Sequence, residues 1–342
     1  MSTTANREAK RSAGEVVSND LGQARSAKQG QSAKQGQSAK QGQSAKQGQS
    51  AKQGQSAKQS RSGKQTLTPK QAEIRNREAK IIELARPMVA RGGLAGLSME
   101  AIAREMSYAK GTIYNHFSCK EEILLALAIG ANNKRLELFV NAVEAMETPR
   151  DKISAIGVAC QEFRIRFEDL FFIDSLVRHS TVWEKASEQR REAMAMCEQY
   201  CMSVVAGVGQ EAVQCGDLVV ADATPVEDIM FGLWSLTYGG MIIDGSSPGL
   251  DSVGVQDAFV AIRRNCHALM DGYRWRPLYE PVRDRKLIDQ VRDRLNRCVG
   301  PELVVNLDVS ELDPAKGAFS MTLDELRRRM SEVVTSDTGE SQ

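Results

Sequence analysis

The sequence predicts an all-helical protein, and three observations favour this class. From about residue 69 onward, apolar residues recur at the three- and four-residue spacing of helices. Thr-Pro pairs at 68–69, 148–149 and 224–225 are typical of helix starts. Two short helical segments separated by a tight turn follow the first long one. With 342 residues, 42% of them hydrophobic, the chain is long enough for one or two packed domains.

Residues 1–67 are expected to be a disordered basic arm. Residues 26–55 are five copies of SAKQGQ, which lacks the aromatic and branched apolar side chains needed for a core. Residues 1–70 carry 13 Lys and Arg against 3 Asp and Glu, and the rest of the chain carries 32 against 41. A basic segment on an acidic body favours a polyanionic partner such as nucleic acid. Two interpretations of the repeats stay open: a tether that samples phosphates, and a neutral expansion.

The sequence shows features of a cytoplasmic protein with no membrane partner. The N-terminus has no apolar stretch typical of a secretory signal. The longest uncharged apolar run, residues 229–243, is 15 residues long, short of the roughly 18 that a membrane span needs. Seven cysteines, an odd number, fit reduced thiols better than a disulfide framework.

The first ordered segments predict a helix-turn-helix. Thr68, Pro69 and Gln71 form a capping box that opens a helix over residues 69–91, which Gly92 and Gly93 stop. Ser98 caps a second helix, residues 99–106. A turn at 107–109 then leads into a third helix that begins near residue 110. In helix-turn-helix proteins the second helix of the motif enters the major groove of DNA.

The stretch LSMEAIAREMSYAKGTIYNHFSCKEEILLALA resembles the DNA-binding domain of the TetR family of bacterial transcriptional regulators. The likeness runs from about Arg77 to Ala128, within a predicted DNA-binding domain of residues 68–128. It implies a TetR-like fold, in which a three-helix DNA-binding domain is joined by a long helix to a larger helical domain. That second domain, placed at residues 129–300, would bind a ligand and dimerise. The resemblance implies a regulator and no enzyme.

The third helix has one buried and one exposed face. Ile113 and Phe117, four residues apart, are predicted to point inward. Gly111 has no side chain, which allows the backbone to approach a groove wall closely. By similarity to the family, Lys110 and Thr112 would reach base edges, whereas Tyr114, His116 and Lys120 would hold phosphates. The predicted DNA-binding residues are Lys110, Gly111, Thr112, Tyr114, Asn115, His116 and Lys120.

Two residues of the turn depart from the family pattern. Ser107 stands where the family often has glycine, and a left-handed backbone there would cost about 1 kcal/mol or somewhat more. Ala109 stands where the family often has a small hydroxyl residue that caps the helix or binds a phosphate. We therefore expect a weaker phosphate clamp at this corner.

Helices are predicted throughout the second domain. Ser118 and Glu121 form a capping box that opens a long helix with an apolar face reaching Met146. Further helices are expected from Thr148, over about 187–214, from a capping box of Thr224, Pro225 and Glu227, and over about 252–273. By resemblance, the last two would pair with their copies in a four-helix homodimer interface. The alternative is burial within one subunit.

The ligand is expected to be an apolar or aromatic compound. The predicted ligand-binding residues are the large side chains of the helical core, namely Phe171, Phe172, Trp183, Met196, Trp234 and Tyr238. The alternative for each of them is ordinary core packing. Cys197 and Cys201, one helical turn apart, are interpreted as packed thiols rather than as an oxidant sensor.

Enzymatic and metal sites are not supported by the sequence. GSSPG at 245–249 matches the nucleophile elbow of hydrolases, but the residue after its serine is Pro248, which has no N–H for an oxyanion hole. The segment is predicted to be a loop between helices. His116, His179 and His267 show no metal-ligand spacing, and no cofactor is expected.

The sequence thus predicts a homodimeric repressor that binds a double-stranded DNA operator and is released by a small apolar effector. The alternative is a basic architectural DNA-binding protein without an effector, which would bind random duplex nearly as well as any operator. Residues 301–342 are expected to be a partly disordered extension, with a last helix at 322–334.

Overall fold

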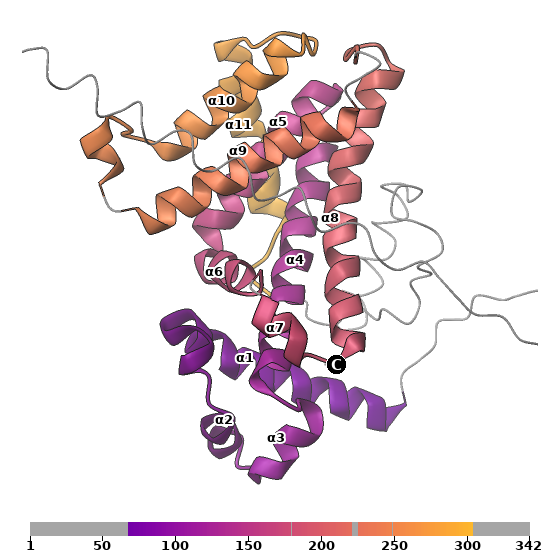
Figure 1. Ribbon diagram of the computed structural model, residues 1–342. Coiled ribbons are helices and arrows are strands. Elements are labelled where there is room, and N and C mark those ends of the chain that lie inside the picture. The colour runs from indigo at the N-terminus through magenta and orange to yellow at the C-terminus, as the bar shows by residue number, and fades with distance from the viewer. Residues whose placement is uncertain (1–67, 179, 221–224, 248, 304–342) are drawn as a thin grey trace, which may run out of the picture. The chain divides into compact units, whose positions relative to one another are not determined.

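The computed structural model describes residues 68–178, 180–220, 225–247 and 249–303, and all regular structure within these ranges is helical. The predicted all-helical class is confirmed for them (Figure 1). The basic arm at 1–67 and the helix expected at 322–334 lie outside the described residues, as do His179 and Thr224. Within the described ranges no helix has the length and apolarity that a membrane crossing needs.

The first helix, α1 (Pro69–Gly96), begins where the sequence predicts. The Thr68 hydroxyl accepts from the N–H of Gln71, and the Gln71 side chain accepts from the N–H of Thr68 at 2.9 Å. The predicted break is confirmed, because Gly92 and Gly93 both have non-helical backbone angles, and a further helical segment then extends the element to Gly96. Gly93 has φ +56°, which glycine adopts without strain. The glycines therefore end the long first part of α1 and place a kink before its short last part.

Helices α2 (Met99–Glu105) and α3 (Lys110–His116) form the predicted helix-turn-helix. The Ser98 hydroxyl caps α2 by accepting from the N–H of Ala101 at 3.2 Å, as expected. The two short helices pack on α1 through a small apolar core whose members are at most 2% exposed: Ile81, Ile82, Ile102, Ile113 and Phe117.

Helix α4 (Lys120–Glu144) joins these helices to the rest of the described chain. Its predicted capping box is wrong: the N-cap is Cys119, which makes no side-chain capping bond. Glu121, the acid of the expected box, instead accepts from Lys185 Nζ at 3.1 Å. A tertiary ion pair thus takes the place of the local cap.

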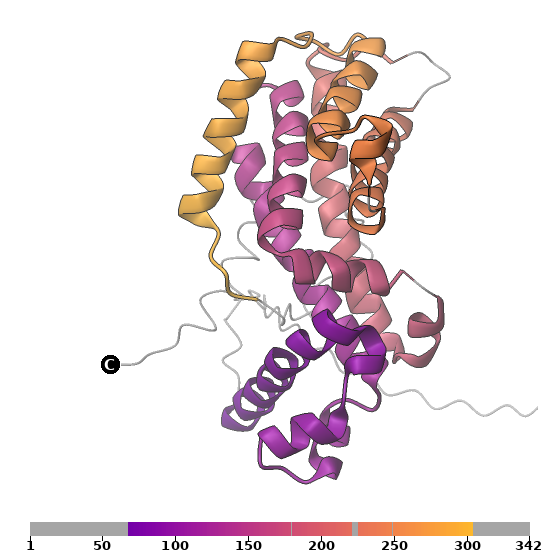
Figure 2. The same cartoon turned by 90° about the vertical axis from the view of Figure 1, so that its left-hand side faces the viewer.

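The larger part of the fold is a bundle around α4 (Figures 1 and 2). Nearly every residue of α4 is buried, because α5 (Pro149–Arg166), α6 (Glu168–Leu176) and α8 (Glu188–Gln214) pack around it. The short α7 (Ser180–Lys185) contacts α4 as well. Thr148 and Ser187 cap α5 and α8 with side-chain bonds, so both predicted helix starts are confirmed.

Helices α9 (Val226–Ser246) and α10 (Ala258–Gly272) pack closely against each other. A Cβ at Gly240 would lie 2.5 Å from Ile262 Cγ1, so only glycine allows this approach. The helix predicted from 252 begins later, at Ala258 after its cap Asp257. Residues 250–253 form instead a short 3-10 turn, η1 (Leu250–Val253), between Gly249 and Gly254, which both have positive φ.

The final described helix, α11 (Pro281–Cys298), packs on α5 and α4, as Figure 2 shows. Beyond it, the Leu303 side chain lies over Gly130 of α4, where a Cβ would meet Leu303 Cγ at 2.9 Å. Lys134 donates to the carbonyl of Gly300 at 3.0 Å. These contacts fix the chain after α11 along the side of α4.

Candidate nucleic-acid interface and ligand cavity

The turn between α2 and α3 is a Schellman motif that contains serine at its left-handed position. The Tyr108 N–H donates to the carbonyl of Ala103 at 2.8 Å, and the Ser107 N–H donates to that of Arg104 at 3.1 Å. Ser107 has φ +57°, so the left-handed backbone considered in the sequence analysis is present. This position usually carries glycine because a Cβ is strained there. The turn sets the direction in which α3 leaves α2.

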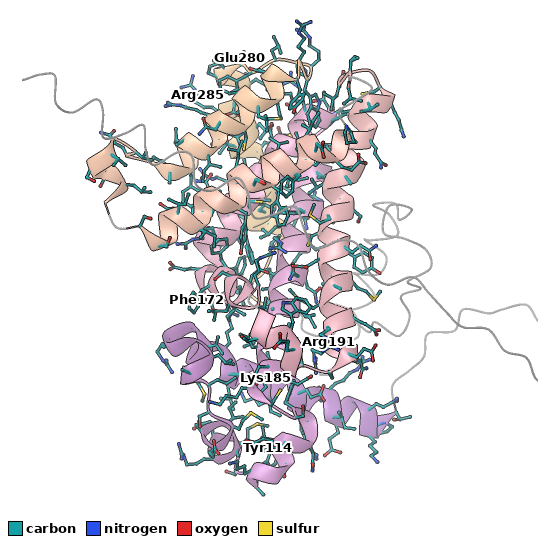
Figure 3. The ribbon with its side chains drawn as sticks, viewed as in Figure 1. Tyr114, Phe172, Lys185, Arg191, Glu280 and Arg285 are labelled. Carbon is teal, nitrogen blue, oxygen red and sulfur yellow. The ribbon has the colours of Figure 1, made fainter. Side chains whose placement is uncertain are left out.

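Helix α3 has the predicted two faces. Ile113 is fully buried and Phe117 is 1% exposed, whereas Lys110, Tyr114 and Asn115 are exposed. Thr112 is half-buried. The N-cap Ala109 makes no side-chain capping bond, as its missing hydroxyl predicts. Figure 3 shows Tyr114 at the outer side of this helix.

The exposed face of α3 is open and positively charged at its start. A Cβ at Gly111 would have no neighbour within 4 Å, so the backbone there is accessible. Lys110 forms an ion pair with Glu100 of α2, which raises the pKa of the lysine and lowers that of the glutamate. The Lys110 ammonium also lies 5.5 Å from the centre of the Tyr114 ring. A phosphate approaching Lys110 would therefore compete with Glu100.

His116 and Lys120 differ from the exposed residues of α3. The His116 side chain is only 10% exposed, and its Nδ1 lies 3.4 Å from Glu78 Oε1 on α1. Its imidazole thus faces α1 rather than open solvent. Lys120 is half-buried at the first position of α4. Tyr108, which the sequence analysis did not select, is 40% exposed beside the turn, and the Arg77 guanidinium lies 5.8 Å from its ring centre.

One ion pair connects α1 directly to the bundle. Arg86 Nε donates to Asp169 Oδ2 at 2.5 Å, and Arg86 Nη2 donates to Asp169 Oδ1 at 3.0 Å. Burial alone would raise the pKa of Asp169, but the hydrogen bonds and charge of Arg86 outweigh it and lower that pKa. The pair links α1, and with it the helix-turn-helix, to α6.

A second connection lies at the start of α4. Glu122 accepts from Arg190 Nε at 3.2 Å and from the backbone N–H of Ser187. The Arg190 guanidinium lies 5.3 Å from the ring centre of Phe117, the residue that ends α3. The beginning of α8 is therefore in contact with the end of the predicted recognition helix.

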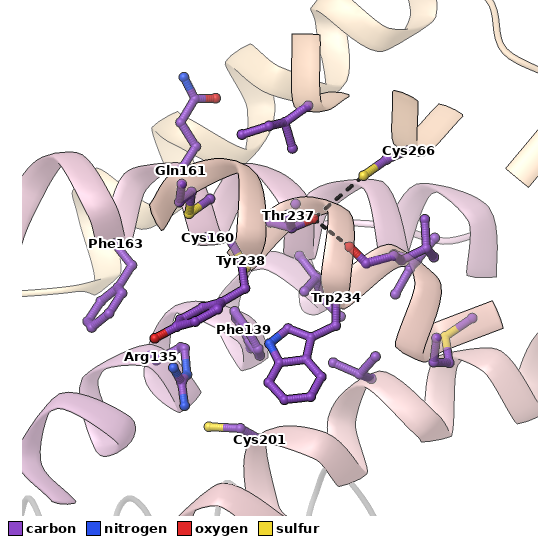
Figure 4. Close-up of a pocket in the computed structure, with 18 of the residues that line it drawn as sticks. Arg135, Phe139, Cys160, Gln161, Phe163, Cys201, Trp234, Thr237, Tyr238 and Cys266 are labelled. Carbon is purple, nitrogen blue, oxygen red and sulfur yellow. Dashed lines mark hydrogen bonds between the residues drawn. The ribbon is translucent and has the colours of Figure 1, made fainter. Parts of the chain in front are cut away.

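The bundle holds a cavity of about 220 Å³, partly open to solvent, between α4, α5, α6, α8, α9 and α10, shown in Figure 4. Phe171, Trp234 and Tyr238, three of the predicted ligand-binding residues, line it. Phe172, Trp183 and Met196 do not. Phe172 follows Phe171 by one position, so it points about 100° away around α6 and is 39% exposed (Figure 3).

The other two residues lie elsewhere in the bundle. Trp183 is on α7, which packs at the end of α4 nearest the helix-turn-helix. Met196 packs on the hydrophobic core from α8, but its neighbours Glu198 and Cys201 are the ones that line the cavity. Large apolar side chains in a sequence indicate a core, and they do not indicate which of them faces a void.

One side of the cavity carries an ionic network that the sequence does not predict; it is buried at Asp174, largely buried at Arg135 and partly exposed at Arg178 and Glu198. Asp174 of α6 is fully buried and accepts from Arg135 Nη1 at 3.1 Å. Arg178 Nη2 lies 3.4 Å from both Asp174 Oδ2 and Glu198 Oε1, and its Nε donates to the Tyr238 hydroxyl at 3.0 Å. Burial would lower the pKa of Arg135, but Asp174 outweighs this and raises it, so the arginine stays charged.

A second ionic group lies toward α10 and α11. Arg263 Nε donates to Asp284 Oδ2 at 2.8 Å, and His267 Nε2 lies 3.0 Å from Asp284 Oδ1. Burial of Asp284 would raise its pKa, but its hydrogen bonds to His267 and Arg263 lower the value to about 2. Asp284 is therefore ionised at neutral pH, and both arginine and histidine are held against it.

Four cysteines of the bundle are protonated, packed thiols. Burial raises the pKa of Cys160 to about 12, and burial also raises those of Cys197, Cys201 and Cys266. Because the thiolate is the reactive form, these side chains are poor nucleophiles at neutral pH. Cys197 and Cys201 are 1% and 3% exposed, in agreement with their interpretation as core residues.

The arrangement around GSSPG does not match a hydrolase site. Gly245 and Ser246 belong to the end of α9, and Ser247 is its C-cap, so a helix precedes the serine where the elbow needs a strand. The segment is thus partly helical rather than wholly loop, and Pro248 lies outside the described residues. The part of the chain that the structure describes also holds no group of three or more His, Cys, Asp or Glu side chains arranged for a metal ion.

Comparison with known proteins matches residues 81–127 to the family model of bacterial regulatory proteins of the tetR family. Over 54 residues the chain is 41% identical to the HTH-type transcriptional regulator Rv1816 of Mycobacterium tuberculosis. The matched region is 16% of this chain and 23% of that protein. Over 76 residues it is 28% identical to the HTH-type transcriptional regulator UidR of Escherichia coli, covering 22% and 39%. The matches thus span less than half the length of these curated relatives.

Among solved structures, the chain is similar to the TetR family transcriptional regulator PfmR from Thermus thermophilus. The likeness covers 56% of this chain and 97% of that one, with 17% sequence identity and a TM-score of 0.43.

Proposed function

Because residues 81–127 are a helix-turn-helix domain of the TetR family, we propose that this chain is a sequence-specific DNA-binding regulator of transcription, a homodimeric repressor released by a small apolar ligand. The observation that carries the proposal is the exposed face of α3, which follows the Schellman turn and carries residues suited to DNA. A family of regulatory proteins supports a regulator rather than an enzyme. A repressor of bacterial genes acts in the cytoplasm, where the DNA lies.

The proposed roles follow from where each side chain lies. Lys110 and Thr112, at the start of α3, read base edges, with Thr112 suited to a thymine methyl group. Asn115 and Tyr114, both exposed, contact the groove wall and a phosphate. Gly111 lets the backbone come close, because nothing lies within 4 Å of where its Cβ would be. Lys120 contributes a phosphate contact from the first turn of α4, where the helix dipole also favours an anion.

His116 has a different role in this proposal from the one that the family resemblance implied. Its ring is packed against Glu78 and is only 10% exposed, so it supports the placement of α3 on α1. A phosphate bond from the opposite ring nitrogen remains compatible with this position, since Nδ1 is the atom facing Glu78.

The proposed dimer uses α9 and α10. Their exposed apolar side chains include Phe231 (61% exposed), Ile243 (53%) and Val260 (42%). Exposed apolar side chains gathered on neighbouring helices are a typical mark of a protein interface. A dimer with two-fold symmetry would place two copies of α3 on successive turns of the major groove, so the operator would be a pseudo-palindrome.

The proposed link between cavity and DNA runs through α6. This nine-residue helix carries Phe171 on the cavity wall and Asp174 in the adjoining ionic network. Asp169, two residues before Phe171 in the same helix, is hydrogen-bonded to Arg86 of α1. A ligand that displaces α6 therefore changes the position of α1, and with it the spacing of the two recognition helices in the dimer.

The proposal is tested by selecting binding sites from random duplex DNA with the purified full chain. We expect an enriched pseudo-palindrome whose half-sites lie about 10 base pairs, or a multiple of that, apart. Recovery of no enriched sequence, with uniform affinity for random duplex, would contradict the proposal and favour the architectural alternative.

The dimer is tested separately by sedimentation of Phe231→Ser against Val219→Ser. Both substitutions remove an exposed apolar side chain, since Val219 is 81% exposed, but Val219 precedes α9 and lies outside the proposed interface. We expect Phe231→Ser alone to weaken the dimer. If both variants sediment as the parent chain does, the proposed interface is contradicted.

A further inference from the structure

The size of the cavity limits its ligand. An engineered cavity of about 150 Å³ in another protein binds benzene, and this one measures about 220 Å³. A compound of about two fused rings therefore matches the space. The walls are mostly apolar, with Phe139, Phe163 and Phe171 among the larger lining residues.

The charges at the wall are balanced without a ligand. Arg135 and Arg178 are paired with Asp174, and Arg178 lies beside Glu198 as well. At the other side Arg263 is paired with Asp284, which also holds His267. Three arginines thus face three carboxylates, and each charged group on the wall has an opposite charge beside it.

This balance favours a neutral ligand. A carboxylate or ammonium group entering the cavity would lose its hydration and find every opposite charge already paired. A hydroxyl group has no such penalty, since it can bond the Tyr238 hydroxyl or a spare N–H of Arg178. The Arg178 guanidinium lies 4.8 Å from the Tyr238 ring centre and 5.7 Å from that of Trp234, so these polar groups sit against an aromatic surface.

The wall is also rich in sulfur, which favours an aromatic ligand over a saturated one. Divalent sulfur makes favourable contacts with aromatic rings, and methionine adapts its shape to them. The sulfur-bearing residues on the wall are Cys160, Cys201, Cys266, Met202, Met230, Met241 and Met270. Because burial keeps these thiols protonated, they act as polarisable surface and not as nucleophiles.

We infer that the cavity binds a neutral aromatic compound of about two fused rings, with a hydroxyl group directed to Tyr238 and Arg178. The inference rests on the proposed function, in which this cavity is the effector site. It adds the charge and the aromatic character of the effector.

Three probes of similar size test it by calorimetry on the full chain at pH 7: 2-naphthol, 2-naphthoate and decahydro-2-naphthol. We expect 2-naphthol to bind at least tenfold more tightly than the anionic 2-naphthoate, and several-fold more tightly than the saturated alcohol. Equal or tighter binding of 2-naphthoate would overturn the neutral class, and equal binding of decahydro-2-naphthol would overturn the aromatic preference. Failure of 2-naphthol to bind would overturn the inference as a whole.

Binding at the cavity is checked by filling it. Gly157 of α5 lines the cavity, and a Cβ there would have nothing within 4 Å, so Gly157→Leu projects into the void without a clash. Gly207 of α8 is also a helical glycine with open space around it, but it does not line the cavity. We expect Gly157→Leu to abolish 2-naphthol binding and Gly207→Leu to leave it unchanged. The same loss in both variants would overturn the assigned site.

Glu198→Gln removes one carboxylate from beside Arg178 and so tests how the balance of charges affects ligand choice. We expect the affinity for 2-naphthoate to rise several-fold and that for 2-naphthol to stay the same. An unchanged ratio of the two affinities would overturn the argument from charge balance.

The ligand class and the proposed regulation fail in distinguishable ways. If 2-naphthol binds as expected but leaves affinity for the selected DNA site unchanged, the ligand class stands and the coupling through α6 is contradicted. If 2-naphthol binding lowers the affinity for DNA, both the ligand class and the coupling through α6 stand.

Discussion

Breaking the ion pair between Arg86 of α1 and Asp169 of α6 is predicted to uncouple the DNA-binding helices from the bundle. The substitutions are Arg86→Met, which keeps an apolar stem, and Asp169→Asn, singly and together. The two hydrogen bonds measure 2.5 and 3.0 Å, and the side chains are 26% and 31% exposed. Bonds to charged groups contribute about 1.5–3 kcal/mol each when buried. Solvent screening at this exposure reduces the expected coupling to about 1–2 kcal/mol in total.

The assay is a double-mutant cycle on urea unfolding, combined with affinity for the selected DNA site. We expect each single variant to lose about 1 kcal/mol of unfolding free energy and DNA affinity to fall by roughly three- to tenfold. The affinity falls because the arrangement that binds DNA becomes one of several that α1 can adopt.

The matched control is the ion pair between Lys152 on α5 and Glu211 on α8. The Lys152 Nζ lies 2.7 and 2.9 Å from the two carboxylate oxygens of Glu211. Lys152→Met and Glu211→Gln should lower stability by up to about 1 kcal/mol and leave DNA affinity unchanged, because this pair lies within the bundle. A coupling energy near zero for Arg86 and Asp169, or an equal loss of DNA affinity in the control, would refute the reasoning.

Three further predictions concern stability. Gly240→Ala should cost about 1–3 kcal/mol on urea unfolding, because its Cβ would lie 2.5 Å from Ile262 Cγ1. The adjacent Gly239→Ala has nothing within 4 Å and should stabilise by about 0.5–1 kcal/mol, so equal effects would contradict the packing. Ser107→Gly should raise the unfolding free energy by up to about 1 kcal/mol, since relief of the left-handed strain exceeds the added entropy of the unfolded chain; a clear loss would contradict it. Asp284 has its pKa lowered from 3.8 to about 2, so its contribution of about 2 kcal/mol is present above pH 4 and is lost as pH falls to 2. The stability difference between the parent chain and Asp284→Asn should therefore shrink over that range, and a constant difference would contradict it.

The sequence predicts elements well where the signal is local. Thr68, Ser98 and Thr148 cap helices in the structure as expected, because an N-cap bond spans only three residues. Ser118 looks equally suitable, yet the helix begins at Lys120, because Glu121 and Glu122 are held by residues 64 to 68 positions away. A local pattern cannot reveal that competition.

The candidate DNA surface was more predictable than the cavity, for a physical reason. The periodicity of a short helix predicts which of its side chains point inward and which outward, and it places Ile113 inside and Tyr114 outside. The cavity depends on which side chains leave a gap between helices, and that is a property of tertiary packing. Arg135 and Arg178 are charged and would be assigned to the surface from sequence alone, although both line the cavity and are paired with the buried Asp174 behind its wall.

The most direct test of the account compares the DNA preference of the parent chain with that of Thr112→Ala, using the same random-duplex selection. Thr112, which is half-buried, follows the open Gly111 in the first turn of α3, and it is expected to read one base pair in each half-site. The account predicts that preference at that one symmetric position relaxes by about 1–3 kcal/mol while the rest of the motif stays unchanged. An identical motif from both proteins, or a loss of affinity spread evenly over all sequences, would contradict the claim that α3 reads the DNA.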